Sequence, residues 1–287
     1  SEMCIRDRFR SLRSSRVGKK SVAQVFPSET IADAMTLGIV NERSANVDAD
    51  FLMPSLTKFG DEPPIKWSKI KKKMSETYPL FQPRKGSVAS FSGGMQTLVD
   101  ALVQELKMFE NVKFHFNQDI SKPGEVATEH HVSISSVIWC APLERTNEEF
   151  TSLDVYVAGY HNNGVSEVQR GYGTLIPDAD LPISGILHES DVHSSPRAPA
   201  DHRLFRIMAP SSRSSREEAV RACLKQILTH SEPVIFKKIG TRKIPIYAPG
   251  YMSKLDINRE YTRAGWFYSG VSVTHIIAEA ERIADLF

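Results

Sequence analysis

The sequence predicts an α/β (α+β) fold in which a layered helix-and-strand part is combined with a part built on a mixed sheet. Two observations lead to this prediction. First, the glycine pair Gly93-Gly94 is followed by a helical stripe of apolar residues and then by apolar strands, an order typical of an α/β layer. Second, short strand patterns between residues 154 and 209 alternate with turns and precede a well-signalled helix.

The composition limits the size and class of the fold. With 287 residues, of which 41% are hydrophobic and 24% charged, the chain can form one large domain or two smaller ones. Its net charge of +2 gives no indication of a nucleic-acid partner. No apolar run approaches the roughly 18 residues of a membrane span. Cys4, Cys140 and Cys223 are scattered without a C-x-x-C pair, which predicts thiols rather than a disulfide framework.

Residues 9–85 are predicted to be mainly helical. Residues 1–8, "SEMCIRDR", resemble translated adapter sequence and are set aside as an artefact. Residues 20–40 have helical spacing, with Ser28 or Thr30 as the cap. The lysine-rich stretch 66–73 around an aromatic residue predicts either a solvated helix face or a basic amphipathic helix on an anionic membrane surface.

Residues 86–143 carry the layered part. The segment "SFSGGMQTLVDALVQELKMF" predicts a helix, because its apolar residues recur at helical spacing. The segments 111–120, "NVKFHFNQDI", and 132–142, "VSISSVIWCAP", predict strands. The second becomes continuously apolar, as expected of a strand that is covered on both faces.

Residues 144–250 form the next part, a sheet and a helix. Strands are predicted in "DVYVAGYH", "PISGILHES" and "RLFRIMAP". The helix in "SSREEAVRACLKQILTH" has Ser214 and Glu217 as a capping box. Its predicted inner face consists of Ala219, Val220, Cys223, Leu224, Ile227 and Leu228.

The last part, residues 251–287, ends in a glycine-bounded turn and an amphipathic helix. Gly265 and Gly270 allow close backbone approach, and Val271-Ser272-Val273 precede a helix whose predicted inner face is Ile276, Ile277, Ala280 and Ile283. A helix N-terminus of this kind could stabilise negative charge on a flavin ring. The alternative is a terminal helix that serves only for packing.

Several catalytic sequence motifs are matched only in part. "GYGTLI" (171–176) lacks the last glycine of a phosphate loop, and "GVSVT" (270–274) lacks the second glycine of a nucleophile elbow. The nine histidines show no metal-ligand spacing, so they are interpreted as exposed or hydrogen-bonded structural residues. The sequence therefore predicts neither a metal site nor a catalytic side chain.

Four segments nevertheless occur in the order and approximate spacing of one family. "SFSGGMQTLVDAL", "GYGTLIP", "KIPIYAPGY" and "AGWFYSGVSV" give the chain a resemblance to protoporphyrinogen oxidases over about residues 20–287. These are FAD enzymes of the amine-oxidase-like flavoprotein group. The resemblance implies an incomplete FAD-binding flavoprotein fold with a helical, mixed-sheet substrate and membrane-binding domain.

The resemblance also implies which residues contact the ligands. Ile120 matches a main-chain contact to the adenosine end of FAD. The terminal contacts, made mostly through the backbone, would be Gly265, Trp266, Gly270, Val271, Ser272 and Val273. Leu175 would flank the substrate macrocycle, and Ile207 or Met208 would lie on the same pocket wall.

The activity that the resemblance implies is oxidation of protoporphyrinogen IX to protoporphyrin IX in heme biosynthesis. Six electrons would pass in three two-electron steps to O₂ through FAD. Peripheral attachment to the mitochondrial inner membrane is expected, homodimerisation is possible, and no nucleic acid is involved.

Departures from the family pattern leave alternatives open. Thr274-His275 replace a common acidic residue and cysteine, and Ile246 and Tyr251 replace a glutamine and a histidine. The family's N-terminal strand and G-x-G-x-x-G turn do not occur in the sequence, which predicts the C-terminal three-fifths of such a protein. The alternatives are another amine-oxidase-like flavoprotein, such as a polyamine oxidase or carotenoid desaturase, or a non-catalytic porphyrin-binding fragment.

Overall fold

The computed structural model describes residues 19–26, 28–54, 91–141, 150–193, 196–213, 216–255 and 260–286. The chain divides into two compact units. Unit 1 comprises residues 1–78, 119–151 and 244–287, and unit 2 comprises residues 79–118 and 152–243. The lysine-rich stretch 66–73 and the N-terminal residues 1–8 lie outside the described residues.

One part of unit 1 consists of short helices that pack around an aromatic core. Its helices are α2 (Val22–Val25), α3 (Glu29–Val40), the 3₁₀ turn η1 (Ser44–Asn46), α4 (Ala49–Leu52) and α11 (Tyr251–Lys254). Phe51 and Tyr247, both fully buried, stack at the centre with ring centroids 3.7 Å apart. Segments from the two ends of the sequence therefore share one core, which also contains Val22, Phe26, Ala32, Val40, Val47, Leu52 and Met53.

The helix predicted over residues 20–40 is confirmed, with a break between α2 and α3. Ser21 caps α2 in a capping box with Gln24, and Ser28 is the N-cap of α3 without a side-chain bond. The fully buried positions on α3 are Ala32 and Thr36.

The rest of unit 1 contains a parallel strand pair and the C-terminal helices. Its elements are α8 (Pro123–Glu129), η3 (Ile134–Ser136), β1 (Ile138–Trp139), β7 (Thr262–Arg263), α12 (Trp266–Ser269) and α13 (Val273–Ala284). The strand predicted over 132–142 is thus shorter than expected, because Ser133 caps a 3₁₀ turn ahead of it. On α13, Ile283 is buried but Ala280 and Ile277 are exposed, so the predicted face was rotated from the real one.

The strand predicted over 111–120 is wrong. No strand forms there, and Asn117 adopts a left-handed conformation at φ 58° that interrupts an extended chain. The preceding helix is confirmed as α7 (Gln96–Leu106), but no residue of α7 is buried, and Leu102 is 56% exposed. The helix was therefore predicted correctly from its apolar spacing, but the burial of its apolar face was not.

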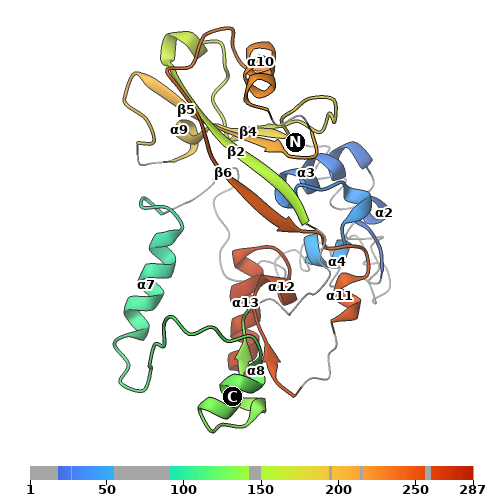
Figure 1. Cartoon of the computed structure of the whole chain (residues 1–287), viewed down its shortest axis with the longest axis vertical. Coiled ribbons are helices and arrows are strands. Elements are labelled where there is room, and N and C mark those ends of the chain that lie inside the picture. The colour runs from blue at the N-terminus through green and yellow to red at the C-terminus, as the bar shows by residue number, and fades with distance from the viewer. Residues whose placement is uncertain are drawn as a thin grey trace, which may run out of the picture. The chain divides into compact units, whose positions relative to one another are not determined.

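Unit 2 is built on a five-stranded sheet in the order β3-β4-β5-β2-β6. Strands β4, β5, β2 and β6 are labelled in Figure 1. The strands are β2 (Phe150–His161), β3 (Gly173–Leu175), β4 (Gly185–Leu187), β5 (His202–Pro210) and β6 (Ile235–Pro245). The β3–β4, β4–β5 and β2–β5 pairs are antiparallel. The three strands predicted between 154 and 209 correspond to β2, β4 and β5.

One face of this sheet carries the core of unit 2. Residues alternate between the two faces of a strand, so every second residue of β2 and β5 points to the same side. Tyr156 and Ala158 on β2 pair with Ile207 and Phe205 on β5, and all four are buried. Helix α10 (Glu217–Ile227) packs on this core face through Val220, Cys223 and Leu224.

The presence of helix α10 was predicted correctly, but its N-cap and the burial of Ile227 were not. Its N-cap is Arg216, without a side-chain bond, in place of the predicted Ser214 box. Ile227, predicted on the inner face, is 41% exposed, whereas Leu228 directly after it packs against the core.

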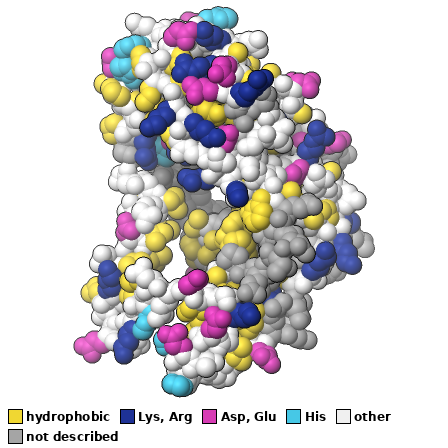
Figure 2. Space-filling view, in the orientation of Figure 1, with side chains coloured by type: hydrophobic (Ala, Val, Ile, Leu, Met, Phe, Trp, Pro, Cys, Tyr) yellow, Lys and Arg dark blue, Asp and Glu magenta, His cyan; other side chains and the backbone are white. Residues whose placement is uncertain are grey.

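Charges are mixed on the surface. On the face drawn in Figure 2, acidic and basic side chains of the described residues are intermingled. Among the helices of the described ranges, none has the length and apolar character needed to cross a membrane.

Candidate functional site: a C-terminal turn and an apolar sheet face

The C-terminal segment of unit 1 begins at the end of a parallel strand pair. Strand β1 pairs with β7, and the Ala264 amide continues the ladder by donating to the Trp139 carbonyl over 3.0 Å. The carboxyl ends of both strands therefore meet at one edge, which is where ligands bind in open α/β sheets. The Tyr268 hydroxyl donates to the Ala141 carbonyl across this edge at 2.7 Å.

Two glycines bound the short helix α12 that follows. Gly265 has φ 105° and Gly270 has φ 97°, a region that other residues rarely adopt. A Cβ at Gly270 would lie 2.6 Å from Pro54 Cγ and 2.9 Å from the Phe51 carbonyl oxygen. The Val271 amide donates to that same carbonyl over 3.3 Å. Gly270 is thus the point at which the turn is held against α4.

The start of α13 presents backbone donors. Ser272 is its N-cap, and the Ser272 hydroxyl accepts a hydrogen bond from the His275 amide at 3.0 Å. Among the described residues, no hydrogen-bond acceptor faces the Val273 amide. The first turn of this twelve-residue helix therefore retains a free backbone donor and the positive end of the helix dipole.

The remaining predicted cofactor residues have separate surroundings. Trp266 packs in the aromatic core, with its ring centroid 5.9 Å from that of Tyr247 and 4.3 Å from that of Phe267. Its side chain therefore has a packing role, and its carbonyl accepts a hydrogen bond from the Gly270 amide at 3.1 Å. Ile120 is half-buried in an irregular segment of unit 1. Gly93-Gly94 precede α7 and belong to unit 2, so the structure does not bring the glycine pair and the C-terminal turn into one unit.

Arg263, at the end of β7, is a feature that the sequence analysis missed. Its three guanidinium nitrogens are buried and make no hydrogen bond with any residue that the structure describes. The guanidinium carbon lies 5.3 Å from the ring centre of Tyr268 and 5.7 Å from that of Tyr261. A buried cation without an acceptor is costly, and an anion would offset that cost. Arg263 and the free Val273 amide at the start of α13 therefore fit a negatively charged cofactor such as FAD.

The second part of the candidate site is the outer face of the sheet in unit 2, opposite its core. Leu175 on β3, Gly185 on β4 and Met208 on β5 lie in one register row. A Cβ at Gly185 would lie 2.7 Å from Met208 Cε and 3.7 Å from Leu175 Cδ2, so these two predicted residues close over the glycine. Ile207 is fully buried on the core face instead. The structure brings Leu175 and Met208 together and separates Ile207 from them.

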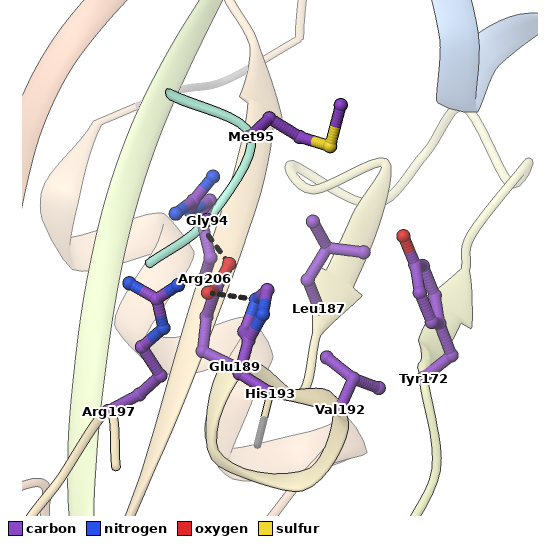
Figure 3. A pocket seen from close by; sticks show the side chains of 9 residues that line it. All are labelled: Gly94, Met95, Tyr172, Leu187, Glu189, Val192, His193, Arg197 and Arg206. Carbon is purple, nitrogen blue, oxygen red and sulfur yellow. Dashed lines mark ion pairs between the residues drawn. The ribbon is translucent and has the colours of Figure 1, made fainter. Parts of the chain in front are cut away.

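The adjacent row contains charge. Leu187 on β4 pairs with Arg206 on β5. Both line a cavity of about 270 Å³, with basic and acidic side chains on one side and apolar or aromatic side chains on the other (Figure 3). Glu189 bridges Arg206 Nε at 3.0 Å and His193 Nε2 at 3.3 Å. The lining residues are Gly94, Met95, Tyr172, Leu187, Glu189, Val192, His193, Arg197 and Arg206.

Arg197 gives this cavity a net positive charge. Arg206 is neutralised by Glu189, whereas no ion pair of Arg197 is recorded among the described residues. On the outer face, the apolar row that contains Leu175 and Met208 therefore lies next to the row that lines the basic cavity. Such a surface suits a flat apolar ligand that carries an anionic group.

A buried ion cluster behind this cavity fixes the geometry of the short helix α9 (Glu189–Val192). Asp191 accepts from Arg203 Nη2 at 2.7 Å and from the Gly171 amide at 3.3 Å. Burial opposes ionisation of Asp191, but these hydrogen bonds prevail and lower its pKa. Burial lowers the pKa of His188, which lies against the Phe205 ring. The cluster connects "GYG" to β5 and is structural.

Comparison with known proteins places these features in context. The chain is 26% identical to the mitochondrial protoporphyrinogen oxidase of Nicotiana tabacum over 253 residues, covering 69% of this chain and 50% of that enzyme. This similarity confirms the resemblance drawn from the four motifs. No protein-family model matches the chain.

Solved structures confirm the fold. A protein from Exiguobacterium sp. 255-15 that is assigned as a protoporphyrinogen oxidase matches with a TM-score of 0.50 and 13% identity, over 89% of this chain and 62% of that one. Reduced UDP-galactopyranose mutase matches with a TM-score of 0.58 and 14% identity, over 99% of this chain and 71% of that one. The relatives are flavoproteins that use FAD, as expected from the motifs. The chain spans about half the length of the tobacco enzyme.

Proposed function

We propose that the chain carries the substrate-binding part and a flavin contact of an oxidoreductase that converts protoporphyrinogen IX to protoporphyrin IX. The similarity to the tobacco enzyme supports the choice of reaction. The observation that carries the proposal is the outer sheet face, where the apolar Leu175–Met208 row lies next to a basic cavity. A tetrapyrrole with carboxylate side chains has this combination of a flat apolar body and anionic groups.

FAD, when bound, would supply the hydride acceptor for oxidation of the macrocycle. The role of this chain would be to bind and orient. The start of α13 and Arg263 would stabilise negative charge on the cofactor, and Gly270 would hold the turn that positions the start of α13. Leu175 and Met208 would exclude water from one face of the substrate.

The cavity argues against the other flavoprotein substrates. A polyamine is a polycation and would be repelled by Arg197, and a carotenoid carries no group for that arginine to bind. Use of O₂ as acceptor, peripheral attachment to the mitochondrial inner membrane and homodimerisation belong to the same proposal through the family resemblance. If the chain acts alone as a fragment, it would bind the porphyrin without oxidising its reduced form.

Replacing Leu175 with Gln should weaken binding of protoporphyrin IX by about 10- to 100-fold, because a leucine side chain buried by a ligand contributes roughly 1.5–3 kcal/mol. The measurement is fluorescence titration of the chain with protoporphyrin IX. Leu175 is 42% exposed, so folding stability should change little. The control is Ile227→Gln at the end of α10, a position of nearly equal exposure at 41%, which should bind normally.

The reaction itself is tested with the product of the complete reading frame. This protein should convert protoporphyrinogen IX to the fluorescent porphyrin faster than autoxidation does. The Leu175→Gln substitution should raise its KM for protoporphyrinogen IX. Oxidation of spermine in place of protoporphyrinogen would contradict the proposal. Binding without oxidation would support the fragment alternative.

Replacing Arg197 with Gln should weaken binding of protoporphyrin IX about tenfold but leave binding of its dimethyl ester unchanged, because only the free acid offers a carboxylate. Fluorescence titration with both ligands measures this difference. Arg216→Gln, an exposed arginine ahead of α10, is the control. Equal losses for acid and ester would show that Arg197 does not bind the carboxylate.

A further inference from the structure

We propose that His161, Asp201 and His202 form a binding site for a divalent metal ion of the Zn²⁺ type. The three side chains each offer one ligand atom, and these atoms lie within 4.8 Å of one another. The site is at the far end of the β2–β5 pair in unit 2. It is independent of the proposed oxidase function.

The sheet register brings the two histidines together. His161 is the last residue of β2, His202 is the first of β5, and they are direct antiparallel partners. Their ring centroids are 4.1 Å apart with planes tilted by 40°. Directly opposed residues of an antiparallel pair have Cβ atoms about 5 Å apart, which suits two imidazoles that share one ion. The long separation of the two histidines in sequence conceals this pair from any spacing pattern.

Asp201 completes the ligand set. Its carboxylate lies 2.6 Å from His202 Nδ1 through Oδ1 and 3.9 Å from His161 Nδ1 through Oδ2. Two imidazoles and a carboxylate form a donor set that Zn²⁺ accepts, with bond lengths of about 2.0–2.2 Å. Donors around a tetrahedral ion are then roughly 3.3 Å apart, so only small side-chain adjustments are needed.

Backbone contacts hold the turn that carries Asp201. The Asn162 amide donates to the Asp201 carbonyl at 2.8 Å, and Asn162 Nδ2 donates to the Ala200 carbonyl at 3.2 Å. The His202 amide donates to the Pro199 carbonyl at 2.9 Å. The donor atoms are therefore presented from a fixed backbone.

The site is open to solvent on one side. The side chains of His161 and Asp201 are 60% and 74% exposed, whereas that of His202 is 20% exposed. Water can then complete the coordination, as it does where a protein supplies three ligands. A bound ion would cross-link the end of β2 to the start of β5.

The test is calorimetric titration of the metal-stripped chain with Zn²⁺, repeated with Co²⁺ for its visible absorption. One equivalent should bind with micromolar affinity, and His161→Gln should weaken binding at least about tenfold. The double variant His161→Gln/His202→Gln should abolish it, and the double variant His115→Ala/His230→Ala should retain it.

A second readout does not depend on the variants' stability. Saturating Zn²⁺ should raise the Tm of the unsubstituted chain, because the ion binds only the folded strand pair. This rise should be absent from the His161→Gln chain, whose circular dichroism should match that of the unsubstituted chain. Binding weaker than about millimolar, or binding that both double variants retain equally, would overturn the proposal.

Discussion

Replacing Arg263 with Met should stabilise the cofactor-free chain by about 1–3 kcal/mol and weaken FAD binding at least tenfold. The first effect follows because the buried guanidinium has no hydrogen-bond partner among the described residues, and an apolar side chain of similar length removes an uncompensated charge. The second follows because that charge would be neutralised by the cofactor. Urea unfolding measures the first effect, and flavin fluorescence quenching in the product of the complete reading frame measures the second.

This prediction is specific because the substitution should raise folding stability while it lowers FAD affinity. A residue that only packs would lower stability when replaced, and the contacts with Tyr268 and Tyr261 would then be its main contribution. Arg242→Met, at an exposed position on β6, is the control and should change stability by no more than about 0.5 kcal/mol. Loss of stability in Arg263→Met together with unchanged FAD affinity would contradict the assignment.

Replacing Gly270 with Ala should destabilise the chain by about 3 kcal/mol or more and reduce FAD affinity as well. Alanine is strained at φ 97°, and its Cβ would collide with Pro54 and the Phe51 carbonyl oxygen. The turn must then move away from α4, which takes the start of α13 with it. Urea unfolding followed by tryptophan fluorescence reports the change, because Trp266 lies next to this turn.

The chain contains a matched control for this substitution. Gly124 lies in the first turn of α8, and a Cβ added there would meet no neighbouring atom within 4 Å. Gly124→Ala should therefore be neutral or stabilising by a few tenths of a kcal/mol. If Gly270→Ala unfolds at the same urea concentration as Gly124→Ala, the close approach at Gly270 does not hold the turn.

Elements with a strong period could be predicted from the sequence. Helices α3, α7, α10 and α13 and strands β2 and β5 all follow clear apolar spacing. Burial was predicted less well, because it depends on partners that the local pattern does not specify. Ile227 and Leu102 have helical spacing but lie exposed. The aromatic segment 111–120 alternates like a strand, yet Asn117 interrupts it.

The conformation of the C-terminal turn could be predicted because the turn lies in consecutive residues. The glycine-bounded turn from Gly265 to Val273 is continuous, and its positive φ angles agree with the glycines. Arg263 could not be singled out, because its lack of a partner is a tertiary property. The choice between Ile207 and Met208 needed the register of β4 and β5. The His161–His202 pair likewise exists only through strand pairing.

The central claim is that the start of α13 contacts the flavin. Hydrogen–deuterium exchange of the Val273 and Thr274 amides, with and without FAD, tests it most directly in the product of the complete reading frame. FAD should slow exchange of both amides at least tenfold, while the corresponding amides of Glu217 and Glu218 in α10 exchange as before. Unchanged exchange at Val273 and Thr274, under conditions where fluorescence shows that FAD is bound, would contradict the claim.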